Sequence, residues 1–180
     1  MKNNLIFHIK TGGTINGCVP EYIEIEKVSA IFTDIVDYKK HIKETFQLKN
    51  DYDEIEICRK DSRKITDEDR LAIADVIKKQ FDGGVRKFLI THGTYTMPDT
   101  AQYLAKNLEK NILESSMIII TGSMYPWVFY GFDAPMNIGA SLSNLVQQET
   151  SGVFICMHGQ RFEPDNVVKD VEGLLFKTIN

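Results

Sequence analysis

Two short segments place threonine hydroxyls beside glycines, and each follows an apolar run typical of a buried strand. The first is Thr11–Ile15, with the sequence TGGTI, and the second is Thr91–Thr96, with the sequence THGTYT. Glycines let the backbone approach a ligand closely, and successive N–H groups at such turns can bind a carboxylate or an oxyanion. The two loops therefore predict a small-molecule site in which hydroxyl groups face the ligand.

Each loop taken singly is commonly a tight turn whose hydroxyl bonds its own backbone. Two such loops on neighbouring parallel strands are a stronger signal, because ligands bind at the carboxyl edge of parallel α/β sheets. We therefore expect Thr14 and Thr94 to lie at one edge and face one substrate. Neither loop contains GxGxxG or GxxxxGKS/T, so nucleotide binding has weak support.

The strands that must position these loops alternate with amphipathic stretches, a pattern that predicts an α/β fold with a mostly parallel sheet and helices on its faces. Five strands are predicted: Leu5–Lys10, Glu54–Cys58, Lys87–Thr91, Met117–Thr121 and Val153–Met157. Four are continuous apolar runs, typical of strands buried on both faces. The segment Glu54–Cys58 alternates instead, which favours an edge position.

Helix signals lie between the strands. Thr66, followed by three acidic residues, predicts an N-cap, and further helices are expected from near Pro98 and over Pro135–Gln148. The segment Val28–Lys49 is helical in part, and the tail after Phe162 has no clear period.

Composition narrows the class of protein. The chain has 180 residues and a formal net charge of −4, with a pI of about 5.6, which favours one globular domain and argues against nucleic acid as a partner. Three scattered cysteines argue against a disulfide framework, and no stretch approaches the roughly 20 apolar residues of a membrane span. With no signal-peptide pattern at the start of the chain, we expect a reduced, cytoplasmic protein without membrane contact.

In several motifs the chain resembles the bacterial-type L-asparaginase family. The resemblance rests on both threonine loops in order, with Met97 after the second, and on three further segments: Asp61–Ser62, Thr121–Met124 and Asp133–Asn137. It implies a three-layer α/β sandwich like the N-terminal domain of these enzymes, and it extends to Asn166–Lys169. We expect the family's usual C-terminal domain to be absent, so that residues 1–180 form a single domain similar to the short members of this family.

The resemblance also implies catalytic roles. It makes Thr14 the nucleophile that attacks a side-chain amide, with Tyr22 as its hydroxyl partner and Thr94 as the threonine that orients water or serves in a proton relay. Gly13 and Gly93 lie beside these threonines and are expected to contact the substrate.

For substrate binding, the resemblance implies that Ser62 holds the α-carboxylate, with Asp61 beside it. Arg63 stands where a glutamine or serine is common in the family. An arginine at this position strengthens a preference for an acid.

Two positions depart from the family pattern. Tyr95 replaces the aspartate that binds the substrate's α-ammonium, and the place of the catalytic lysine falls on Gln148. Asp133 and Asp99 are candidates to supply the missing negative charge. Lys169 is the possible base, reaching the site from the tail or from a second subunit.

Other chemically capable residues have structural explanations. His8 and His92 lie in or beside buried strands and are expected to be core histidines. Cys156–His158 lacks the further ligands of a zinc site, so no metal is implied. The aromatic segment Tyr125–Tyr130 favours a subunit contact over a lid, since the family forms dimers or tetramers.

Three functions remain open. The first is a cytoplasmic asparaginase-like amidohydrolase that needs no cofactor and converts L-asparagine or a related small amide to a carboxylate and ammonia, as a homodimer or homotetramer. The second is a catalytically impaired small-molecule, amino-acid-binding or regulatory module. The third is hydrolysis of another amide, one without an α-amino group.

Overall fold

The computed structural model describes residues 4–17, 38–126 and 133–179, and its main sheet follows the predicted strand pattern. The sheet has six strands in the order β2-β1-β3-β4-β5-β6. They are β1 (Leu5–Gly12), β2 (Asp51–Lys60), β3 (Lys87–Thr91), β4 (Met117–Thr121), β5 (Gly152–Met157) and β6 (Gln160–Phe162). The first five pair in parallel and β6 pairs antiparallel to β5. The predicted fold class is confirmed, and β2 lies at an edge as its alternation predicted.

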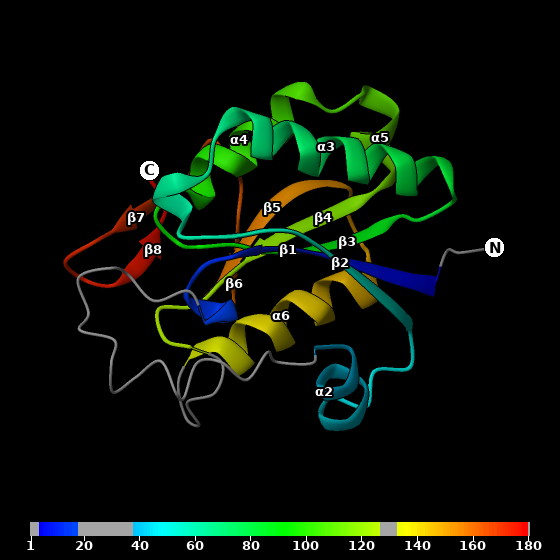
Figure 1. The fold of residues 1–180 in the computed structure, drawn as a ribbon, viewed down its shortest axis with the longest axis horizontal. Coiled ribbons are helices and arrows are strands. Elements are labelled where there is room, and N and C mark those ends of the chain that lie inside the picture. The colour runs from blue at the N-terminus through cyan, green and yellow to red at the C-terminus, as the bar shows by residue number, and fades with distance from the viewer. Residues whose placement is uncertain (1–3, 18–37, 127–132, 180) are drawn as a thin grey trace.

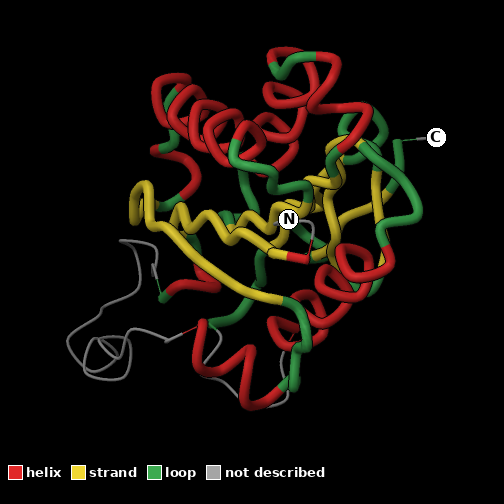
Figure 2. Tube along the Cα trace, turned by 90° about the vertical axis from the view of Figure 1, so that its right-hand side faces the viewer, coloured by secondary structure: helices red, strands yellow, loops and turns green. Residues whose placement is uncertain are grey.

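Helices cover both faces of the sheet (Figures 1 and 2). On one face lie α3 (Asp67–Asp82), α4 (Met97–Asn107) and α5 (Lys110–Ser115), and on the other α6 (Asp133–Gln147) and α2 (Tyr38–Thr45). This arrangement is the expected three-layer sandwich. No helix in the described part of the chain is both long enough and apolar enough to cross a membrane.

Local sequence explains where two of these helices begin. The Thr66 side chain accepts a hydrogen bond from the Asp69 backbone N–H, and the Asp69 carboxylate accepts one from the Thr66 N–H at 2.9 Å. This capping box begins α3 at the predicted position. Pro98 lies in the first turn of α4, where a backbone N–H would have no acceptor within the helix, so the N–H that proline lacks costs no helical hydrogen bond.

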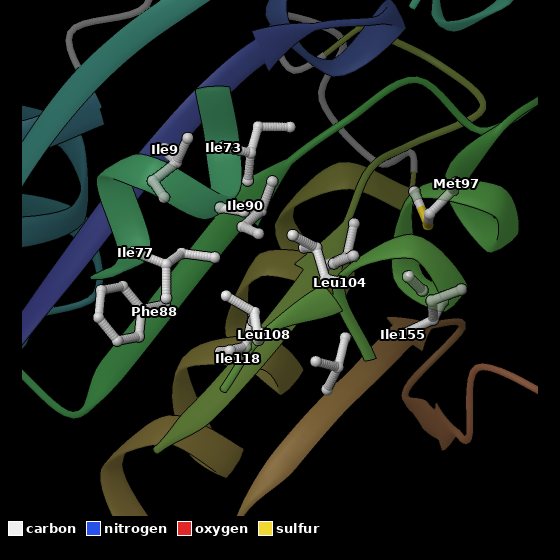
Figure 3. Close-up of a cluster of buried hydrophobic side chains, with 14 of the residues drawn as sticks. Ile9, Ile73, Ile77, Phe88, Ile90, Met97, Leu104, Leu108, Ile118 and Ile155 are labelled. Carbon is white, nitrogen blue, oxygen red and sulfur yellow. The ribbon is translucent and has the colours of Figure 1, made fainter. Parts of the chain in front are cut away.

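The core lies on both faces of the sheet. β3 and β4 are buried along their whole length, because helices pack against each side. Figure 3 shows the cluster between the sheet and α3 and α4, in which Ile9 and Ile90 face Ile77 and Leu104. This core fixes the central strands, and therefore the loops at their carboxyl ends.

A small antiparallel hairpin follows the main sheet. Its strands are β7 (Val168–Asp170) and β8 (Leu175–Lys177), which the sequence pattern did not predict. Buried Phe176 anchors the hairpin to the core, and its backbone N–H donates to His158 Nε2 at 3.2 Å. Figure 1 shows the hairpin beyond the carboxyl ends of the central strands. Lys169, opposite Phe176 in the register, is thereby brought to this edge.

Candidate active site

The loops after β1 and β3 touch through their glycines. A Cβ built on Gly13 would lie 2.4 Å from the Cα and N atoms of Gly93, so only glycine permits this contact. Gly13 also has a φ of 76°, and its N–H donates to the Lys60 carbonyl at 2.9 Å. The close approach places Thr14 and Thr94, each next in sequence to one of these glycines, at the same edge of the sheet.

A third segment, the short 3₁₀ helix Ser62–Lys64 after β2, packs on the second loop. A Cβ on Gly93 would lie 2.7 Å from Ser62 Cβ. Ser62 Oγ accepts hydrogen bonds from the N–H groups of Tyr95 and Thr96 at 3.1 and 3.4 Å, and Thr96 Oγ1 donates to the Ser62 carbonyl at 2.6 Å. The clamping role of Thr96 was not predicted, although it is the third hydroxyl of the THGTYT segment.

Thr14 is half-buried and begins a 3₁₀ turn, Thr14–Asn16, that is hydrogen-bonded to β3. In this turn, Asn16 Nδ2 donates to Thr91 Oγ1 at 3.3 Å. The turn therefore holds Thr14 at a fixed place relative to the end of β3. Two predictions fall wholly or partly outside the described residues: the hydroxyl partner Tyr22 and the aromatic segment, of which residues 127–130 are not described.

Lys169 lies within this group of loops. Its Nζ donates to Thr94 Oγ1 at 2.7 Å, which joins the hairpin to the second threonine loop. Burial, with the Arg63 guanidinium as the second cause, lowers the pKa of the Lys169 ammonium, and the Asp61 carboxylate partly opposes the shift. A lysine with a lowered pKa is more readily the neutral amine that accepts a proton.

Asp61 and Arg63 form a bidentate ion pair at the same edge. Asp61 Oδ1 accepts from Arg63 Nε at 3.0 Å, and Oδ2 accepts from the Arg63 terminal nitrogen at 2.7 Å. The Arg63 backbone N–H also donates to Oδ1, at 2.9 Å. The hydrogen bond from the Arg63 side chain is the main reason why the pKa of the Asp61 carboxyl is lowered.

Gln148 does not belong to this site, contrary to the expectation that it takes the place of a catalytic lysine. It follows the last turn of α6, where its N–H donates to the Asn144 carbonyl at 2.8 Å. The carbonyl of neighbouring Val146 accepts from Lys87 Nζ at 3.2 Å, and Lys87 begins β3. The end of α6 therefore lies at the amino edge of the sheet, opposite the threonine loops.

Asp133 and Asp99, the candidates to replace the aspartate that is missing at position 95, make different contacts from those expected of a substrate-binding carboxylate. The Asp133 carboxylate accepts from the N–H groups of Met124 and Tyr125 at 2.8 and 3.2 Å and from Asn137 Nδ2 at 3.1 Å. It thus ties the loop after β4 to the start of α6. Asp99 is exposed in the first turn of α4.

The two histidines near the loops are core residues, as expected. His8 is fully buried between the Tyr52 hydroxyl and Thr91 Oγ1, and burial lowers its pKa to about 3. His92 is also fully buried, and burial lowers its pKa to about 4. Both rings are therefore neutral near pH 7. Within the described ranges, no group of three or more His, Cys, Asp or Glu residues is placed to hold a metal ion.

The glycine contact yields a stability prediction. Gly13→Ala is expected to destabilise the fold by about 2–5 kcal/mol, because the new methyl group meets the Gly93 backbone and alanine is strained at this φ. Gly159→Ala is the matched control, since Gly159 has a similar φ of 74° but no atom within 4 Å of the place that its new methyl group would occupy. Denaturant unfolding measures both. Equal losses in the two variants would show that the contact between the loops does not contribute.

The sequence of this chain is similar to a protein family and to a curated protein. The family described as "Asparaginase, N-terminal" matches residues 5–172. A protein named glutaminase-asparaginase, from Acinetobacter glutaminasificans, is 30% identical over 176 residues, which cover 94% of this chain and 50% of that relative. The chain therefore spans about half the length of the curated relative it matches.

Solved structures share the fold. A probable cytoplasmic L-asparaginase from Campylobacter jejuni aligns with a TM-score of 0.78 at 27% identity and covers 96% of this chain, which spans 52% of that structure's chain. L-asparaginase I from Vibrio cholerae aligns with the same TM-score of 0.78 at 23% identity, over 99% of this chain and 52% of its own. At that identity the second likeness concerns the fold alone.

Proposed function

Because the chain belongs to the asparaginase family through its N-terminal domain, we propose that it hydrolyses the side-chain amide of L-asparagine or a related small amide, through an acyl-enzyme on Thr14. The observation that carries this proposal is the 2.7 Å hydrogen bond between Lys169 Nζ and Thr94 Oγ1, beside the Gly13–Gly93 contact. It joins a hydroxyl to an amine of lowered pKa, next to the loop that bears a second hydroxyl. A nearby base and a hydroxyl relay of this kind are one way in which a threonine nucleophile can be supported.

In the first step of the proposed reaction, Thr14 Oγ bonds to the amide carbon. Its proton goes to the amide nitrogen, and the C–N bond breaks to release ammonia. Water then attacks the resulting ester, and its proton passes through the Thr94 hydroxyl to the neutral Lys169 amine. Lys169 returns this proton to Thr14 as the carboxylic acid leaves. One amide and one water give one carboxylate and one ammonium ion.

The remaining predicted residues would bind the substrate. Ser62 and the cationic Arg63 are suited to the α-carboxylate, and Asp61 orients Arg63 through their ion pair. The backbones of Gly13 and Gly93 let the amide approach closely. Tyr22 keeps its proposed role as hydroxyl partner of Thr14.

The proposed chemistry uses the chain's own hydroxyl and amine groups and calls for no cofactor. We also propose a cytoplasmic protein that assembles as a homodimer or homotetramer. The likeness to a structure named as a probable cytoplasmic L-asparaginase supports the location. Size-exclusion chromatography with light scattering measures the assembly.

The test of the proposed function is ammonia release from L-asparagine, L-glutamine and succinamate, which is asparagine without its α-amino group. We expect catalytic release of ammonia from at least one of the three, measured with a coupled dehydrogenase assay. If the folded protein binds one of these amides in calorimetry but releases no ammonia, the proposal fails. That outcome would favour a small-molecule binding or regulatory module instead.

A further inference from the structure

Tyr95 is an exposed residue of the second threonine loop, with two cations against its ring. The side chain is 39% exposed, and it follows Thr94 in the second loop. Lys169 Nζ lies 3.6 Å from the ring centroid and the Arg63 guanidinium carbon 4.9 Å from it. Both distances are within the range of cation–π attraction. The Tyr95 ring is therefore already in contact with two of the protein's own cations, which would repel a substrate cation placed beside it.

The charges around Tyr95 do not cancel. Arg63, which contacts the same ring, and its ion-pair partner Asp61 are charged neighbours that act on Lys169. The Asp61 carboxylate is bound by Arg63 through three hydrogen bonds, so its charge is largely balanced by that guanidinium. At pH values where Lys169 is protonated, Lys169, Arg63 and Asp61 together carry one positive charge.

From this arrangement we infer that the site selects amides of dicarboxylic acids that have no cationic α-ammonium group; the inference rests on the proposed function. A substrate ammonium beside Tyr95 would be repelled by the charges of Lys169 and Arg63. It would also lose part of its hydration without forming an ion pair with a carboxylate in return. A carboxylate at the same place would be attracted by both cations. Succinamate keeps the carboxylate and the amide of asparagine and lacks only the ammonium.

The test compares kcat/KM for succinamate and for L-asparagine on the rising limb of the pH profile, below the pKa of Lys169, where most of the protein carries the Lys169 ammonium. In the wild-type protein we expect succinamate to be favoured by about 10-fold or more, in keeping with the effect of an unpaired charge on binding. Tyr95→Asp supplies a carboxylate to this group and should shift the ratio toward asparagine by at least about 10-fold. Arg63→Gln should shift the ratio in the same direction by a smaller factor.

Lys64→Gln is the matched control for charge. Lys64 lies next to Arg63 in the same 3₁₀ helix and is exposed, so this variant removes the same charge without removing a cation from the Tyr95 ring. The ratio of the two kcat/KM values should be unchanged in it. Thermal unfolding of each variant checks that the fold is intact.

A binding measurement separates this inference from the proposed function. Succinate and L-aspartate are the two products, and calorimetry should show succinate bound about 10-fold more tightly or better, whether or not the protein turns over. If asparagine is hydrolysed as efficiently as succinamate, or if L-aspartate binds as tightly as succinate, the inference is wrong while the amidohydrolase proposal stands. Absence of ammonia release with preferential binding of succinate would overturn the proposed reaction and support the selectivity.

Discussion

Thr14→Ala is expected to reduce kcat for ammonia release by at least about 10³-fold, because it removes the oxygen that would form the acyl-enzyme. The backbone of the 3₁₀ turn should persist, since the Thr14 carbonyl, not its side chain, accepts the hydrogen bond from the Gly17 N–H at 3.0 Å. The measurement is the coupled ammonia assay on the amide that the wild-type protein hydrolyses fastest. Circular dichroism and thermal unfolding establish that the variant is folded.

Thr14→Ser is the matched control, because it keeps the hydroxyl and removes only a methyl group. It should retain a measurable part of the wild-type kcat. A second readout is the intact mass after rapid acid quench, in which the acyl group should add to the wild-type chain and not to Thr14→Ala. If Thr14→Ala remains as active as the wild type, Thr14 is not the nucleophile, and the other hydroxyls of the two loops become the candidates.

Lys169→Met should lower kcat by about 10²-fold or more, because it removes the group proposed to accept the proton through Thr94. The control is Lys177→Met on the partner strand of the same hairpin, where the ammonium pairs with Asp170 at 3.0 Å on the surface. This control should keep kcat within about two-fold of the wild-type value, since surface ion pairs contribute little to stability. Equal losses in both variants would indicate a structural effect on the hairpin.

The pH profile gives Lys169 a signature that a structural role would not produce. Only the neutral amine can accept a proton, so kcat should rise with pH and level off above the pKa of Lys169. Because burial and Arg63 lower this pKa, the midpoint of the rise should lie below the ordinary lysine value of about 10.4. Arg63→Gln removes one cause of the shift and should move the rising limb to higher pH. If the rising limb of the pH profile lies at the same pH in Lys169→Met as in the wild type, the limb reports the titration of another group.

The central part of the fold could be predicted from the sequence because its signals are local. Strands buried on both faces are continuous apolar runs, and β3 and β4 begin and end at the predicted residues. The cap at Thr66 and the edge position of β2 were also predicted correctly. Because ligands bind at the carboxyl ends of parallel strands, the strand pattern also indicated the loops that bear Thr14 and Thr94.

The hairpin β7–β8 was not predicted, because its strands are short and stabilised by contacts distant in sequence. Phe176 is buried against the core cluster, while Val168 and Leu175 remain exposed, so no periodic pattern marks the segment. Its consequence for the site is large. The register of the hairpin, not the sequence near either threonine loop, brings Lys169 to Thr94.

Gln148 was misplaced for a related reason. Residue types on a helix show which face is buried, but the edge of the sheet at which the helix ends depends on its direction. α6 starts at the carboxyl edge, where Asp133 binds the loop after β4, and returns to the amino edge. The sequence alone thus determined the strands, the caps and the two hydroxyl loops, whose signals lie within a few residues. Only the tertiary structure decided which distant groups meet at those loops, because such contacts depend on chain direction and register.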